Sequence, residues 1–206
     1  MTTFATPQAI TAEIRVAAGD VRVVAGDRAD TVVQVFPTNP AKKADVGAAA
    51  QTVVTFESGA LQVRGPQPSR FGMGNPGSIQ VEIALPRGSR LDGELMAGGL
   101  TTEGALGAVA VATLDGHLVI DRAAGAVLNT QRGNLTVRHT TGASTLDTRY
   151  GDITVGVAAG LAARMDVHTG LGRIRNSAAE GVDGVDISAR SGFGDITIHR
   201  SELTAA

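Results

Sequence analysis

The 206-residue sequence contains no cysteine and no tryptophan, and its only aromatic residues are five phenylalanines and one tyrosine. Without cysteine, disulfide bonds, thiolate metal sites and cysteine nucleophiles are excluded. The scarcity of aromatic rings disfavours the base-stacking surfaces that single-stranded nucleic acids need, and it disfavours sugar stacking for the same reason. These absences leave few of the common catalytic and binding classes open.

Long apolar runs are also missing. No stretch of about 18 apolar residues is present, so we expect no membrane-spanning helix. The first eight residues, Met-Thr-Thr-Phe-Ala-Thr-Pro-Gln, combine no basic segment with an apolar core, so no signal peptide is expected. The sequence therefore predicts a cytoplasmic location.

Charge is scarce and nearly balanced. Only 18% of the residues are charged, the formal net charge is -2, and the only lysines are Lys42 and Lys43. This balance provides no general attraction to phosphate or to an anionic membrane. We therefore expect no nucleic-acid partner and no membrane insertion, whereas a protein partner or self-association stays open.

Glycine is abundant, with 27 residues, and it alternates with β-branched residues in short runs. Such runs predict strands over 11–23, with a Gly-Asp hairpin turn at Gly19, and over 31–36, 52–56, 61–63 and 79–85. Residues 41–50 favour a short helix, and residues 65–78, rich in proline and glycine, favour a mobile exposed loop. Residues 1–90 are thus predicted to form an antiparallel β-layer with one buried face.

A short phrase recurs beyond residue 91: Thr or Ser, two variable residues, Gly, one polar residue, then alternating Leu, Ile or Val. Its glycines are Gly98, Gly116, Gly133, Gly151, Gly172 and Gly194, spaced by about 17–22 residues. Apolar residues recur two positions after and five positions before most of these glycines. Such a period predicts stacked two-strand units that share internal apolar columns.

The sequence therefore predicts an all-β fold in which the N-terminal antiparallel layer, 1–90, continues into a small β-solenoid (a β-helix or β-roll), 91–206. The two regions are expected to form one continuous folding unit, with degenerate capping repeats at the start and the end of the solenoid.

Each recurring residue type has a structural explanation. Glycine permits the backbone conformation of a sharp turn, and the inward Thr or Ser hydroxyl can pair with a turn amide. The residue after each glycine, the pair before it and the outward-facing positions vary most. We therefore expect any function on those positions.

The repeated phrase, together with the strand end Ile83-Ala-Leu-Pro-Arg-Gly-Ser89, resembles a bacterial adhesin-like β-strand-repeat family of unknown function. The N-terminal segments Val32-Val-Gln-Val-Phe-Pro37 and Gly59-Ala-Leu-Gln-Val-Arg-Gly-Pro66 are similar to actinobacterial-type members. The resemblance covers residues 12–198. It implies a solenoid-like all-β fold and supplies no catalytic residue.

Among the motifs that could bind a ligand or catalyse a reaction, one polar cluster remains a candidate. The Gly72-Met-Gly-Asn-Pro-Gly77 segment has the spelling of a dinucleotide fingerprint, but Pro76 and the absence of a following helix argue against it. The Gly-Asp pairs lack calcium-repeat spacing, and the four histidines show no ligand spacing and are expected at the surface. The cluster comprises Arg132, Asp147, Arg149 and Tyr150, which could bind an anion but fits a solvated salt bridge better.

The sequence therefore predicts no catalytic, cofactor-binding or metal-ligating residue. We interpret the chain as a non-enzymatic β-repeat scaffold or protein-interaction module. The alternative is a small-molecule or glycan binding protein that uses residues 65–78 as a lid.

Overall fold

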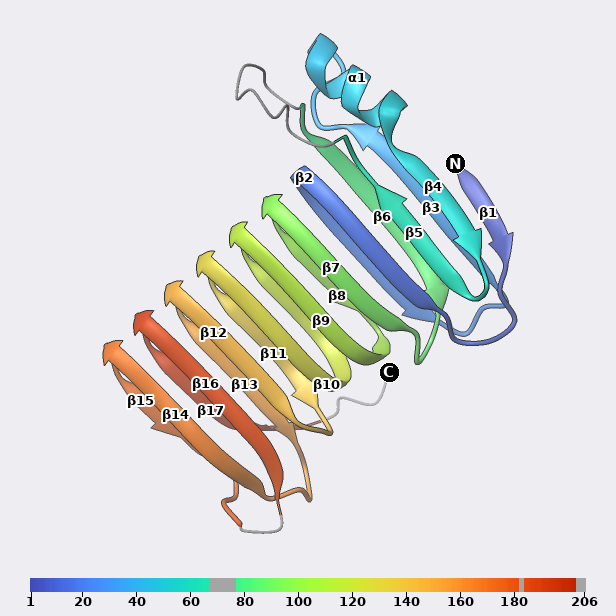
Figure 1. Ribbon diagram of the computed structural model, residues 1–206. Coiled ribbons are helices and arrows are strands. Elements are labelled where there is room, and N and C mark those ends of the chain that lie inside the picture. The colour runs from blue at the N-terminus through green and yellow to red at the C-terminus, as the bar shows by residue number, and fades with distance from the viewer. Residues whose placement is uncertain (67–76, 182–183, 203–206) are drawn as a thin grey trace.

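The computed structural model describes residues 1–66, 77–181 and 184–202 (Figure 1). These residues form seventeen strands and one helix, which confirms the all-β class. In chain order the elements are β1 (Thr2–Ala5), β2 (Thr11–Gly26), β3 (Asp30–Pro37), α1 (Lys43–Gln51), β4 (Val53–Glu57), β5 (Ala60–Arg64), β6 (Ile79–Pro86), β7 (Arg90–Ala97), β8 (Leu100–Glu103), β9 (Ala105–Asp115), β10 (Leu118–Arg132), β11 (Leu135–Thr140), β12 (Ser144–Tyr150), β13 (Ile153–Ala158), β14 (Ala163–Leu171), β15 (Ile174–Asn176), β16 (Val185–Phe193) and β17 (Ile196–Ser201).

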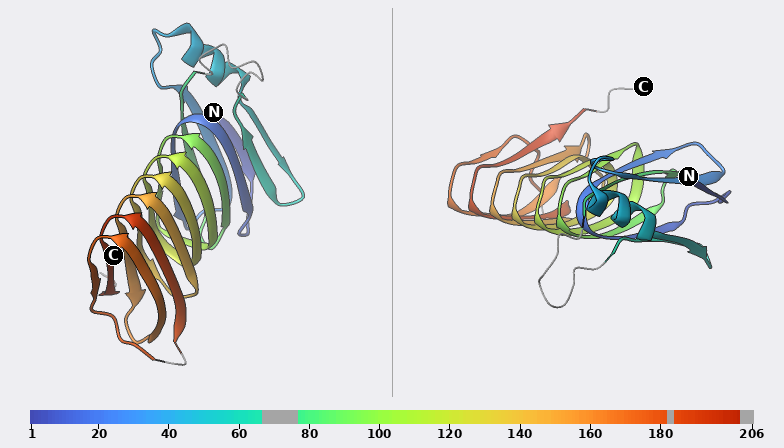
Figure 2. Two further views of the ribbon diagram at one scale, coloured as in Figure 1. Left: turned by 60° about the vertical axis from the view of Figure 1, so that its left-hand side comes forward. Right: turned by 90° about the horizontal axis from the view of Figure 1, so that it is seen from above.

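The strands lie in two facing layers with the apolar core between them (Figures 1 and 2). One layer has the order β4, β5, first half of β2, β7, β9, second half of β10, β12, β16, β14. The other has the order β1, β3, β6, second half of β2, β8, first half of β10, β11, β13, β17, β15. Because β2 and β10 belong to both layers, β2, β7, β9, β10 and β8 close into a ring of parallel pairings.

The predicted apolar columns are confirmed. The residues two positions after the repeat glycines pair directly across neighbouring strands, and five of the six are fully buried. In spatial order this column is Leu100, Leu118, Leu135, Ile153, Ile196 and Ile174. The repeat thus sets the register between strands and places one side chain of each unit except the Gly172 unit in the core.

The order of the last two units differs from their order in the chain. Strand β12 pairs with β16 and β13 pairs with β17, while β14 and β15 lie beyond them at the end of the stack. The Gly194 unit is therefore inserted between the Gly151 and Gly172 units. The prediction that the last unit in sequence caps the stack was wrong, because the preceding unit occupies the end.

The predicted N-terminal antiparallel layer is also corrected. Strand β2 continues through Gly19 without a hairpin and pairs in parallel with β5, β6, β7 and β8. Antiparallel pairing is confined to β1–β3, β3–β6 and β4–β5 among the described strands. Alternation of apolar and polar residues is the same in parallel and antiparallel strands, so it could not reveal strand direction.

The predicted helix is confirmed as α1, at the same end of the molecule as β1 and β4 (Figure 1). Its buried Asp45 carboxylate accepts hydrogen bonds from the backbone N–H groups of Asn39, at 3.1 Å, and Ser78, at 3.0 Å. Most of the predicted 65–78 loop, residues 67–76, lies outside the described residues.

The repeat glycines stack along the corner of the fold, and their backbones approach closely. A Cβ built at Gly133 would overlap the carbonyl oxygen of Gly116, and one at Gly151 would overlap that of Gly133. The φ angle of Gly133 is +144°, which residues with a Cβ rarely adopt. Glycine is therefore required here for two reasons, the close approach of the backbones and the positive φ. The sequence predicted only the second.

The inward Thr or Ser hydroxyls bind the same glycine column. Thr148 donates to the carbonyl oxygen of Gly133 at 3.1 Å, Ser191 to that of Gly151 at 2.9 Å, and Thr169 to that of Gly194 at 2.8 Å. The predicted turn amide is therefore corrected to a turn carbonyl. Each such buried bond contributes about 1 kcal/mol.

The polar residues that follow the glycines form a second ladder. The Nδ1 atom of His117 accepts from the Asn134 N–H, and Asn134 Oδ1 accepts from the Asp152 N–H, both at 2.9 Å. Asp152 Oδ1 accepts from the Asp195 N–H at 2.7 Å. Asp195 in turn accepts from the Arg173 N–H, and this bond and the nearby arginine charges lower the pKa of Asp195. These positions were predicted to be free for function, and the structure shows that they join the strands instead.

We predict that Gly133→Ala strongly destabilises the fold. The strain of a positive φ alone costs about 1–3 kcal/mol, and overlap with the Gly116 carbonyl adds to it. The free energy of unfolding from urea denaturation measures the effect. Gly26→Ala is the matched control, because nothing lies within 4 Å of a Cβ at that position. Equal stabilities of the two variants would contradict the close backbone approach.

Candidate functional site

The predicted polar cluster is only partly assembled. The Arg132 guanidinium pairs with Asp115 at 3.2 Å, and the Arg149 guanidinium lies 5.4 Å from the centre of the Tyr150 ring. Arg132 and Tyr150 are directly paired across β10 and β12. Asp147 lies earlier on β12, in register with Asn129 and Arg190, and forms no ion pair with a described residue. Arg132 thus pairs with an aspartate outside the predicted cluster, and Arg149 contacts an aromatic ring rather than a carboxylate.

Phe193 is the member of this corner that the sequence analysis missed. Its ring stacks on that of Tyr150, with the centroids 5.1 Å apart and the planes at 10°. Phe193 precedes Gly194 just as Tyr150 precedes Gly151, so both occupy the same column. They are neighbours only because β16 is inserted beside β12, which the order of repeats in the sequence does not reveal.

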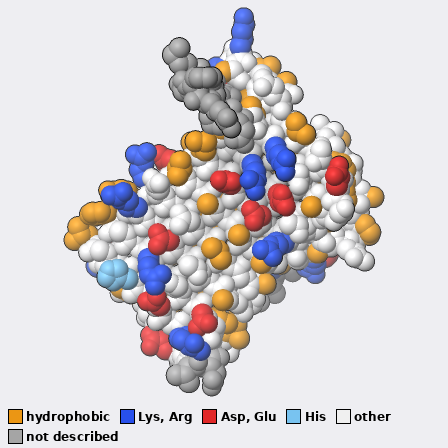
Figure 3. Space-filling model, in the orientation of Figure 1, with side chains coloured by type: hydrophobic (Ala, Val, Ile, Leu, Met, Phe, Trp, Pro, Cys, Tyr) orange, Lys and Arg blue, Asp and Glu red, His pale blue; other side chains and the backbone are white. Residues whose placement is uncertain are grey.

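The residues that directly precede the repeat glycines form a column across the strands. This column becomes apolar toward the end of the stack formed by β14. After Asp115 and Arg132 come Tyr150, Phe193 and Leu171, which are 44%, 48% and 66% exposed. We call these last three residues the apolar corner. Figure 3 shows apolar side chains gathered at the left edge of the molecule, where β14 and β16 end in the same view of Figure 1.

In the described ranges, most of the end of the stack beside this corner is uncovered. Ile174 in β15 is 49% exposed, although the other members of its column are fully buried. On β14, the side chains of Met165 and Val167 are only half-buried. Residues 178–181 cover only the start of β14, where Ala163 bridges to Glu180. We call β14 and β15 together the open end.

The opposite end is covered. Strands β1 and β4 run antiparallel along their neighbours, and the rings of Phe4 and Phe56 meet there at 5.5 Å. Both phenylalanines pack against the core, and their direct strand partners, Thr31 and Leu61, are fully buried. The two ends of the stack therefore differ: one has an apolar cover and the other exposes its core column.

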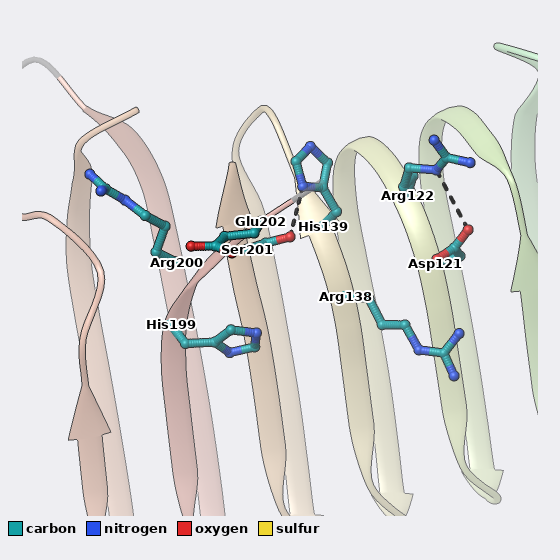
Figure 4. Close-up of a pocket in the computed structure, with 8 residues that line it drawn as sticks. All are labelled: Asp121, Arg122, Arg138, His139, His199, Arg200, Ser201 and Glu202. Carbon is teal, nitrogen blue, oxygen red and sulfur yellow. Dashed lines mark hydrogen bonds and ion pairs between the residues drawn. The ribbon is translucent and has the colours of Figure 1, made fainter. Parts of the chain in front are cut away.

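A groove of about 570 Å³ opens on the layer that contains β10, β11 and β17 (Figure 4). We call it the basic groove. Three arginines and two histidines face only two carboxylates in its lining, which consists of Asp121, Arg122, Arg138, His139, His199, Arg200, Ser201 and Glu202.

The two carboxylates, Asp121 and Glu202, offset only two of the three arginine charges in the lining. Asp121 Oδ2 accepts from the Gly104 N–H at 2.9 Å and lies 3.6 Å from the Arg122 Nε. Arg138 and Arg200 form no ion pair with any residue in the described ranges. A local positive charge therefore remains on a chain whose formal net charge is -2.

His139 lies at one side of the groove and is only 7% exposed, which corrects the prediction that all histidines are at the surface. Its Nδ1 lies 2.9 Å from the Ser201 Oγ. Burial lowers the pKa of His139, the Arg122 charge lowers it further, and Asp121 opposes the shift. The neutral imidazole is thus the favoured form in the folded protein.

The described residues form no metal centre and no membrane-spanning helix. Among the described residues no group of three or more His, Asp or Glu side chains could hold a metal ion. None of the described helices has the length and apolar character needed to cross a membrane. The predicted lid falls mainly on residues outside the described ranges, so the structure does not test it.

No family model matches this chain, and no curated protein matches it. Several solved structures resemble it, including the following three. A candidate cell adhesion protein from Clostridium sporogenes is 10% identical, with a TM-score of 0.44, and the match covers 97% of this chain and 98% of that one. A candidate adhesin from Bacteroides fragilis is 12% identical, with a TM-score of 0.47 and coverages of 96% and 95%. A candidate lipid binding protein from Parabacteroides distasonis is 10% identical, with a TM-score of 0.34 and coverages of 95% and 96%.

Two of these three proteins are named for adhesion, and at these identities and TM-scores the likeness assigns no role to this chain. None of the comparisons supports the narrower actinobacterial-type assignment.

We predict that His139 makes the fold sensitive to acid. Because its pKa is lowered in the folded state, the unfolded chain binds the proton more readily, and stability falls as the pH drops below about 6.5. His139→Asn, which can keep a bond to Ser201, removes this loss. Urea denaturation between pH 7.5 and pH 5 measures it, with His168→Asn on the exposed side of β14 as the control. A wild-type pH profile that is identical to that of His139→Asn would contradict the assignment.

Proposed function

We propose that the protein is a non-enzymatic β-solenoid scaffold that docks end to end with a second copy of itself through the open end and the apolar corner. The exposed core column at β15 is the observation that carries this proposal: Ile174 is 49% exposed where its column partners are fully buried. Exposed apolar groups beside an unpaired strand edge favour association.

A second copy fits the open end better than an unrelated surface does. In the second copy, β14 and β15 also form the end of the stack. Their free edges therefore have the same separation as those of the first copy, and their side chains have the same spacing. The core column could then continue from one copy into the other. The strand edges would gain hydrogen bonds and the apolar side chains would lose contact with water.

The difference between the two ends favours a closed pair over a filament. Head-to-tail stacking needs two complementary ends, but the β1 and β4 end is covered by Phe4 and Phe56. A two-fold dimer uses the same surface on both copies and needs only one open end. The asymmetry of the stack therefore supports a dimer that does not grow further.

The closest approach to a catalytic pair supports a non-enzymatic role. His139 Nδ1 and Ser201 Oγ are 2.9 Å apart, but both residues are buried. A serine hydrolase needs an exposed serine against one imidazole nitrogen and a carboxylate against the other. The described residues place no carboxylate in hydrogen-bonding contact with the His139 ring. The contact between His139 and Ser201 is instead consistent with a structural role, in which it attaches the end of β17 to β11.

Sedimentation velocity over a wide concentration range tests the dimer. The wild-type protein is expected to shift from monomer to dimer without forming larger species, whereas Leu171→Asp/Ile174→Asp remains monomeric because it places two charges in the interface. Val127→Asp is the control, since Val127 is similarly exposed, at 56%, but lies on β10 in the middle of the stack. A wild-type protein that is monomeric at every concentration would overturn the proposal, as would open-ended growth.

A further inference from the structure

The geometry points to a second binding site: we propose that the basic groove binds an oligoanion, a ligand that carries several phosphate or sulfate groups. This site is independent of the docking end, because its residues lie on β10, β11 and the end of β17 rather than on β14 and β15. The stacking of the repeats does not require the positive charge of the basic groove.

Two of the three groove arginines have no carboxylate partner, which they share with Arg64, Arg90 and Arg149 among the described arginines. Ten described arginines form ion pairs with Asp or Glu, whereas Arg138 and Arg200 form none. Arg122 shares Asp121 with the backbone of Gly104. Positive groups that gather without partners repel one another, so a bound anion would relieve this repulsion.

The spacing of the groups indicates the class of ligand. Figure 4 shows the guanidinium groups of Arg122, Arg138 and Arg200 well apart: that of Arg138 points toward the strand of Arg122, and that of Arg200 points in the opposite direction. A single small anion could not contact all three at once, whereas a chain of linked anionic groups could. Guanidinium groups are well suited to phosphate and sulfate oxygens because they donate two parallel hydrogen bonds.

The pKa of His139 can report binding, because His139 lines the basic groove. The Arg122 charge contributes to its lowered pKa. The other charged or titratable groups around it are Asp121 on β10, Arg138 on β11, and His199, Arg200 and Glu202 on β17 and the residue after it. An oligoanion that neutralises the arginines adds negative charge near the imidazole, so binding is expected to raise the pKa of His139.

Isothermal titration calorimetry with tripolyphosphate, and with inorganic phosphate as the single-anion probe, tests the proposal. Tripolyphosphate is expected to bind at one site per chain and inorganic phosphate to bind at least about tenfold more weakly, because fewer charge-assisted bonds form. Arg138→Gln/Arg200→Gln should weaken tripolyphosphate binding by at least about tenfold, with the unfolding temperature unchanged or raised because like-charge repulsion is removed.

The matched control is Arg64→Gln/Arg90→Gln, which removes the same charge from two exposed arginines that also lack ion pairs. The control is expected to bind tripolyphosphate like the wild type. An NMR titration of the histidines supplies the second readout, in which tripolyphosphate raises the pKa of His139. An equal loss of binding in both double variants, equal affinity for the two probes, or an unchanged His139 pKa at saturation would each overturn the proposal.

Discussion

The backbone contact between neighbouring repeat glycines is the constraint on which the rest of the structure depends. Each glycine lies against the carbonyl oxygen of the glycine in the adjacent unit, at a distance that no Cβ allows. Once two units meet in this way, their strands are in register. The apolar column then meets in the core, the Thr or Ser hydroxyl reaches a carbonyl, and the polar residue after the glycine reaches an N–H of the next unit.

The same contact does not encode the order of the units. The Gly172 and Gly194 units carry the same phrase, and either could stack on Gly151 by these rules. In the fold, the Gly194 unit takes that place, which brings Phe193 onto Tyr150 and leaves β14 and β15 at the end. The exposed Ile174 and Leu171, from which we infer docking, are thus a consequence of the inserted unit.

Sequence reasoning predicted what is local and periodic: the all-β class, the columns, the short helix and the partly assembled corner. It could not give strand direction in residues 1–90, because alternation is the same for both directions. The basic groove was invisible for another reason. Arg138 and His199 are far apart in the chain and follow no repeated phrase, and they approach each other only because β13 pairs with both β11 and β17. Outward-facing side chains contribute little to the fold, so no periodic pattern marks them.

The most direct test of the inserted unit uses the absence of cysteine from the chain. Thr145 on β12 and Ser188 on β16 are direct neighbours, whereas Asp166 on β14 pairs with the far side of Ser188. A disulfide requires Cα atoms within about 7 Å, and two strand spacings amount to about 10 Å. After mild oxidation, mass spectrometry of Thr145→Cys/Ser188→Cys should show a complete intramolecular disulfide, and Thr145→Cys/Asp166→Cys should show none. The reverse result would mean that the units stack in chain order and would contradict the account of the open end.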